Sequence, residues 1–279
     1  VQSIVKQAEL SFSAANISRV TNDGFHLKMR GKLINTGPFD AYISFPDGVE
    51  VIWEGHKMAK IKMPPICAAA DEGVPDLETT GELTITDNKA FTKFSRYILH
   101  NKKFTWTITS KKVRVQALNI VFDDVILTKE VSFDAFNNLK GVKITSFDIP
   151  GQTSNALKAK AGTTIPSPAS LGIDLETATF KIYYDGVYQG WIKSSDLFLA
   201  PKSVTPSVLT GQLTERKSDK ELKSTGQLFS LYLQGKNQTL GIVGNNVITK
   251  ENGNKPVKWL SDAFKTLTLH VTLPGHIYK

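Results

Sequence analysis

The chain has 279 residues, of which 41% are hydrophobic and 22% are charged, and its formal net charge is +8. This composition is typical of a globular protein with enough apolar residues for two cores, so it excludes a chain that is disordered throughout. The apolar runs within the chain fall short of the ~20 residues that span a bilayer. Because the basic excess is modest and no recognition motif accompanies it, we expect no nucleic-acid partner.

An internal repeat organises the chain. Residues 31–55 (GKLINTGPFDAYISFPDGVEVIWEG) and residues 162–186 (GTTIPSPASLGIDLETATFKIYYDG) begin and end with glycine and share the order of their apolar positions. A second repeated segment is TGELT at 80–84, which recurs as TGQLT at 210–214. A period of about 130 residues is that of a domain rather than of a solenoid unit. We therefore expect two tandem copies of one fold.

The two predicted domains comprise residues 1–130 and residues 131–279. The segment that joins them is apolar and strand-like, and it has no Gly/Ser-rich or Pro-rich linker. We therefore expect the two copies to pack closely or to share strands.

The first copy is predicted to consist of strands interrupted by one helix. Residues 26–33 (HLKMRGKL) and 103–115 (KFTWTITSKKVRV) alternate apolar and polar side chains, which is typical of half-buried antiparallel strands. After Asp87, a favourable N-cap, apolar residues recur at three- and four-residue steps from Ala90 to Ile98 and predict a helix.

The second copy repeats this organisation. Residues 218–236 (SDKELKSTGQLFSLYLQGK) predict the corresponding helix, although Gly226 weakens it by about 1 kcal/mol relative to alanine. Turn sequences such as Asp185-Gly186 separate the strands at regular intervals. Strands of this length and spacing predict a mostly β fold with two tandem Ig-like or fibronectin-like antiparallel β-sandwiches, each with one α-helix.

No constellation typical of catalysis or metal binding is present. The five histidines are scattered, and no nucleophile or phosphate-binding motif occurs. The neighbouring carboxylates Asp123 and Asp124 would point to opposite faces of a strand. The single cysteine, Cys67, excludes an internal disulfide and is expected to pack as a small apolar residue. We predict no cofactor, no metal and no enzymatic activity; an enzyme assembled from distant carboxylates ranks third among the functions.

The segment 51–65 (VIWEGHKMAKIKMPP) supplies the candidate contact surface. It alternates apolar residues with Lys57, Lys60 and Lys62, which could face an anionic membrane surface. The alternative is a solvated hairpin whose lysines face water while Trp53 and Ile61 pack in the core.

Two sequons add candidate modification sites. Asn16 and Asn237 each begin an Asn-X-Ser/Thr triplet, which is compatible with N-glycosylation in a secretory compartment.

The repeats also carry a family resemblance. Residues 34–45 (INTGPFDAYISF), 146–151 (SFDIPG) and 166–192 (PSPASLGIDLETATFKIYYDGVYQGWI) resemble a fungal family of single-pass membrane proteins with an uncharacterised luminal or extracellular region. That region is related to the group 2 late-embryogenesis-abundant domain of plants. The resemblance implies tandem Ig-like β-sandwiches behind a transmembrane helix upstream of Val1, and a superfamily that includes a fungal vacuolar protein implicated in ending autophagy. One departure is Ile165-Pro166, where many relatives have Asn-Pro.

Two functions are compatible with these features. The first is a non-enzymatic binding or scaffolding ectodomain of a membrane-anchored protein that engages lipid or a membrane surface, since lipid binding has been suggested for the superfamily. The second is a cell-surface module that interacts with protein or glycan. The resemblance places the chain on the luminal or extracellular side of a membrane of the vacuole, the endoplasmic reticulum or the cell surface. A β-sandwich can hold an acyl chain only where its core is open.

Overall fold

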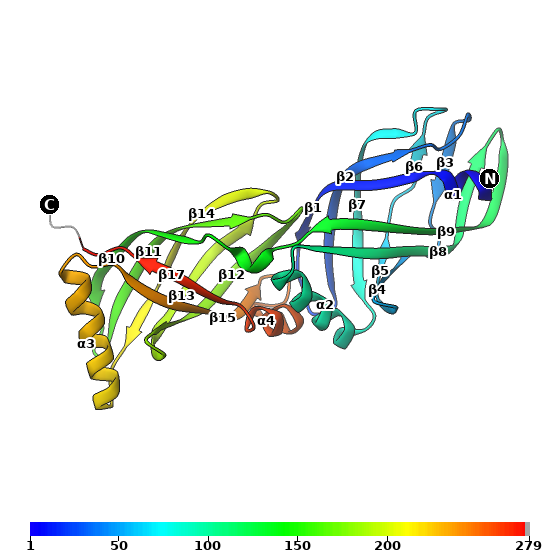
Figure 1. Cartoon of the computed structure of the whole chain (residues 1–279). Helices are drawn as coiled ribbons and strands as arrows, with labels where there is room; N and C mark the ends of the chain where they lie inside the picture. The colour runs from blue at the N-terminus through cyan, green and yellow to red at the C-terminus, as the bar shows by residue number, and fades with distance from the viewer. Residues whose placement is uncertain (277–279) are drawn as a thin grey trace.

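The computed structural model describes residues 1–276 and shows two β-rich lobes joined end to end (Figure 1). Residues 277–279, the end of the predicted second domain, lie outside the described residues. The first lobe contains α1 (Gln2–Gln7), β1 (Glu9–Ser18), β2 (Gly24–Ile34), β3 (Ala41–Ser44), β4 (Val49–Trp53), β5 (His56–Lys62), β6 (Ile66–Ala68), β7 (Val74–Ile85), α2 (Asn88–His100), β8 (Lys103–Ala117) and β9 (Ile120–Asp134). The second lobe contains a short 3-10 turn, η1 (Asn137–Leu139), β10 (Lys143–Gln152), β11 (Ala156–Ser167), β12 (Leu171–Tyr184), β13 (Val187–Leu199), β14 (Ser203–Thr214), α3 (Asp219–Leu233), β15 (Gln238–Thr249), β16 (Lys255–Pro256), α4 (Lys258–Phe264) and β17 (Thr268–Leu273). The fold is mostly β, as the alternation predicts.

The two lobes share one strand order. Neighbouring strands run β1-β2-β7-β5-β4-β8-β9 in the first lobe and β10-β11-β14-β13-β12-β15-β17 in the second, antiparallel at every step. The helices α2 and α3 occupy equivalent places, between β7 and β8 and between β14 and β15. Both repeated hairpins turn through two residues with positive φ, Glu54-Gly55 and Asp185-Gly186, which suits the twist of paired strands. The repeated sequences therefore form corresponding hairpins.

The number of helices and the type of sheet differ from the expectation. Within residues 1–276 there are four α-helices instead of two, because α1 precedes the first strand and α4 lies between β16 and β17. The sheet is mixed rather than antiparallel, since residues 15–17 of β1 pair in parallel with residues 171–173 of β12. Alternation along a strand fixes which side chains point inward but carries no information on the direction of its partner. The end of the predicted first domain, residue 130, lies inside β9.

Side-chain orientation follows the alternation in most strands. Trp53 and Ile61 are buried, as expected for core positions of the first hairpin. Cys67 is exposed, which corrects the expectation that it packs inside. Its neighbours Ile66 and Ala68 are buried, and successive residues of a strand point to opposite faces.

The lobes are joined by a continuous apolar core. At the junction α2 packs on α4, where the rings of Phe91 and Trp259 meet edge to face with centroids 4.9 Å apart. The indole N–H of Trp259 donates to the Thr21 carbonyl at 2.9 Å. At the end of α2, His100 Nε2 lies 2.7 Å from Thr266 Oγ1. These contacts tie the two lobes into one packed unit.

Candidate functional site

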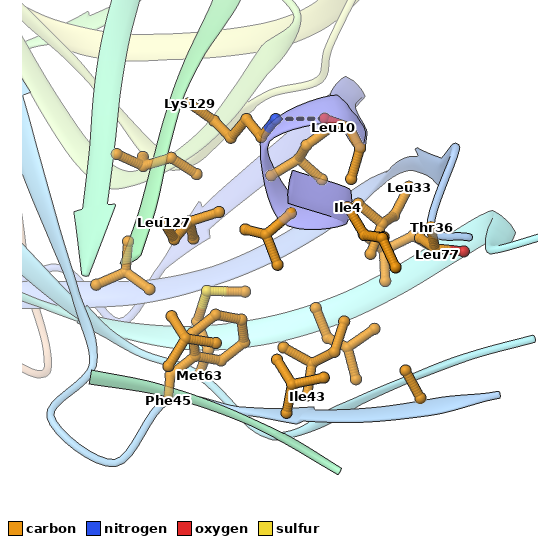
Figure 2. Close-up of a pocket in the computed structure, with 18 of the residues that line it drawn as sticks. Ile4, Leu10, Leu33, Thr36, Ile43, Phe45, Met63, Leu77, Leu127 and Lys129 are labelled. Atoms are coloured by element: carbon orange, nitrogen blue, oxygen red, sulfur yellow. Dashed lines mark hydrogen bonds between the residues drawn. The ribbon is translucent and has the colours of Figure 1, made fainter. Parts of the chain in front are cut away.

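An apolar cavity of about 330 Å³ lies inside the first lobe. Its wall is formed by the inward side chains of α1 and of the strands from β1 to β9 (Figure 2). Of the residues that line it within the described chain, Thr36 and Lys129 have polar side chains, and Trp106 adds an indole N–H. The volume lies within the ~300–1,000 Å³ that is usual for small-molecule sites. This part of the lobe can therefore hold a small apolar molecule.

The cavity is closed towards the second lobe by aromatic rings. Phe12 stacks on Phe133 with centroids 6.2 Å apart, and Phe133 meets Trp106 at 5.4 Å. Further towards the tip of the lobe, Phe45 and Leu127 face the cavity and are only half-buried. The interior of the first lobe is therefore densely packed near the second lobe and unfilled towards its tip, so the cavity is closed at the end that faces the second lobe.

The opposite end of the cavity reaches the tip of the β8–β9 hairpin. Leu118 and Ile120 at that tip and Phe39 before β3 line the cavity, yet 63%, 54% and 43% of their surfaces are exposed. The pairing of Ala41 with Ala117 brings these segments together. We call Phe39, Leu118 and Ile120 the rim. The rim makes the apolar surface continuous from the outside of the lobe to the inside.

The helix α1 covers one side of the cavity. It is held there by side-chain hydrogen bonds between α1 and β9. The Gln2 amide both donates to and accepts from the backbone of Ile126, each at 2.9 Å, and so takes the place of a neighbouring strand. The ammonium of Lys129 donates to the carbonyls of Lys6 and Ala8, where α1 ends (Figure 2). A cation at this position satisfies carbonyls that have no partner within a helix. Ile4 of α1 faces the cavity.

The equivalent space in the second lobe is nearly filled. The cavity there is about 60 Å³, because Phe264 of α4 packs against Phe180 with ring centroids 5.1 Å apart. A third cavity, at the junction of the lobes, is about 50 Å³. The helix α4 has no counterpart in the first lobe, which explains why the duplicated fold has a large cavity in one copy.

The three predicted lysines lie on the outside of the first lobe. Lys57 forms an ion pair with Glu50 at 2.8 Å. Lys60 is opposite Glu50 and Lys62 is opposite Glu82 in the strand register. All three are exposed on β5, and acidic residues of the neighbouring strands lie beside them. Their contact with an anionic surface stays a prediction.

The two sequons differ in their surroundings. Asn16 lies in β1 between β2 and β12, and its buried Oδ1 has no hydrogen-bond partner among the residues that the structure describes. Asn237 is exposed just before β15, where its Oδ1 accepts from the Gly275 amide at 3.0 Å. Glycosylation of either asparagine stays a prediction, and Asn237 is the more accessible of the two.

Sequence reasoning did not find the cavity, α1 or the role of Lys129. The half-exposed residues that face the cavity alternate like those of a filled core, so no local sequence signal distinguishes an empty interior from a filled one. A weak signal exists at the tip, where Leu118, Ile120 and Val121 are apolar residues beside a turn. Within residues 1–276 no helix has the length and apolar character needed to cross a membrane, and no three His, Cys, Asp or Glu residues form a metal-binding group.

One family of unknown function and several solved structures show similarity to this chain. A family described as "protein of unknown function" (DUF3712) matches residues 56–182, from β5 to β12. No curated protein matches the chain. A β-glucuronidase of glycoside hydrolase family 2 shares 8% identity with a TM-score of 0.27, over 94% of this chain and 26% of that protein. The B domain of a biofilm-associated protein shares 9% identity with a TM-score of 0.18, over 94% of this chain and 85% of that one. The chain thus spans about a quarter of the glucuronidase.

Proposed function

We propose that this protein is a non-enzymatic lipid-binding protein whose first lobe holds an acyl chain. The observation that carries the proposal is the cavity of about 330 Å³ with its almost wholly apolar wall. Each methylene moved from water into such a space contributes about 0.8 kcal/mol. A chain can therefore bind without a charged partner inside the lobe.

The rim supports uptake of the chain from a membrane. Large apolar side chains that are exposed together mark surfaces that meet apolar partners. Because Leu118, Ile120 and Phe39 also line the cavity, a lipid that leaves a bilayer at this tip would keep its chain in apolar surroundings throughout. The rim thus favours a membrane as the source of the ligand.

The fold of each lobe and the location of the protein belong to the same proposal. We assign each lobe to an Ig-like β-sandwich, which the shared antiparallel strand order supports. From the family resemblance we propose that the lobes lie on the luminal or extracellular side of a membrane, with an anchor upstream of Val1. In support, α1 lies at the same end of the molecule as the rim (Figure 1).

Filling the cavity tests the proposal. Ile43 and Leu127 both face the cavity and are half-buried, so I43W/L127W should fill it with two indoles. We expect the purified parent protein to retain acyl lipids from a lipid extract in native mass spectrometry and the variant to retain fewer than a tenth as many. The melting temperature should not fall, because filling a void does not overpack the core.

The matched control is Val208→Trp, which adds an indole at an exposed site of β14 in the second lobe. It should leave lipid retention unchanged. A parent protein without any bound acyl species would contradict the proposal, and so would a filled variant that retains as much lipid as the parent.

A further inference from the structure

A second, polar depression lies beside the cavity on the outside of the first lobe. It has a volume of about 350 Å³ and lies where the end of α1 meets β1, β2 and β9. Ala8, Leu10 and Lys129 line both this depression and the apolar cavity. One layer of side chains therefore separates the two spaces. We call this depression the lysine pocket, after the residues described below.

The wall between the two spaces is a seam without strand pairing. β1 and β9 lie side by side, but within residues 1–276 no backbone hydrogen bond joins them. Phe12 and Phe133 close the seam near the second lobe. Nearer the tip, the Lys129 side chain closes it by reaching the end of α1. Because side chains rather than a hydrogen-bonded ladder close this part, it can open without breaking a sheet.

The charges around the lysine pocket favour an anion. Lys6 and Lys32 are exposed in its wall, and in the described part of the chain neither forms an ion pair. Lys129 adds a third positive charge, against the carboxylates of Glu9 and Glu130. The Glu9 carboxylate accepts from the Asn35 side chain at 3.0 Å and keeps its negative charge. Lysines thus outnumber carboxylates, and two of them have free ammonium groups.

We infer that the lysine pocket binds the anionic headgroup of the ligand whose chain fills the cavity. The chemical group is a phosphate or a carboxylate, for which charge-assisted hydrogen bonds from Lys6 and Lys32 are suited. In the bound state the chain, taken up at the rim, crosses the seam beside Lys129, whose apolar stem lines the cavity while its ammonium stays at the polar side. This inference rests on the proposed function and adds the polar half of the ligand to it.

Three probes with the same chain test the inference on the full protein. Dodecyl phosphate, tridecanoate and dodecanol share a twelve-carbon alkyl chain and differ only in the headgroup, and their affinities can be measured by calorimetry below micelle formation. We expect the parent to bind at least one anionic probe about three- to tenfold more tightly than dodecanol, as two exposed ion pairs allow. In K6Q/K32Q this preference should disappear while dodecanol binding is unchanged. The preference should also weaken at high salt.

The charge-matched control is K28Q/K220Q, which removes two exposed lysines outside the pocket and should keep the preference. If the affinity gain over dodecanol is larger for the phosphate probe than for the carboxylate probe, the ligand is phospholipid-like. The reverse order identifies a fatty acid. If dodecanol binds but the anionic probes bind no better, or if K6Q/K32Q keeps the preference, the inference is wrong while the proposed function stands. If inorganic phosphate competes as well as dodecyl phosphate, the pocket is a simple anion site and the inference is wrong. If dodecanol does not bind to the parent, the proposed function itself is wrong.

Discussion

Single side chains hold the movable parts of the first lobe, and Lys129 is the main example. Its ammonium satisfies two carbonyls at the end of α1, and α1 has no buried side chain to keep it in place. We expect Lys129→Met to loosen α1 without unfolding the lobe, because hydrogen bonds from a charged donor contribute about 1.5–3 kcal/mol each and methionine preserves the apolar stem. Hydrogen exchange should become at least tenfold faster for the amides of Val5 and Ala8, which donate to the carbonyls of Val1 and Ile4, and stay unchanged in β7. Lys111→Met, at an exposed position of β8, is the control; equal exchange rates in parent and K129M would contradict this role.

Among the elements, α3 depends on its N-terminal capping box. Glu221 accepts from the backbone amides of Lys217 and Ser218 at 2.9 and 3.1 Å, and these hydrogen bonds lower the pKa of its carboxyl below the usual 4.5. A carboxyl whose pKa is lowered by folding stabilises the protein above its unfolded pKa, and this stabilisation is lost as the pH falls through the folded value. We therefore expect Glu221→Gln to lower the melting temperature at pH 7 and the difference from the parent to shrink as the pH falls through the lowered folded pKa. Thermal melts from pH 2.5 to 7 measure this, and Glu215→Gln at the neighbouring exposed site should show no such difference; a constant difference at every pH would contradict the role of the charge.

At the scale of the whole molecule, the aromatic contact between α2 and α4 couples the lobes. Trp259 is buried against Phe91 and Phe25, and its indole also donates to the Thr21 carbonyl of the first lobe. Replacing a buried tryptophan by alanine costs about 3–5 kcal/mol. Because this contact lies between the lobes, we expect Trp259→Ala to split one calorimetric unfolding transition into two. The control is Tyr184→Phe, a change inside the second lobe that removes a hydrogen bond to Gln238. It should lower the temperature of the single transition without splitting it. A parent protein that already unfolds in two transitions would show that the lobes are not coupled.

The repeated architecture is encoded in local patterns along the chain. Period-two alternation placed Trp53 and Ile61 inside, and Asp87 accepts from the Ala90 amide at 2.9 Å as the predicted N-cap. The turns at Glu54-Gly55 and Asp185-Gly186 are predictable from the sequence because two successive positive φ angles favour few residue types. These features are local, so the residues that cause them are neighbours in the chain.

The position of the candidate site depends instead on how whole elements pack against one another. The parallel pairing of β1 with β12 and the docking of α4 depend on how two lobes meet, which no local pattern records. The cavity depends on the distance between opposite walls, and Phe45 has the same sequence signature whether its interior is filled or empty. The lysines that surround the lysine pocket come from α1, β2 and β9, which are far apart in the chain. The alternation of a strand determines which residues face inward, whereas the packing of whole elements determines whether the space they face is filled.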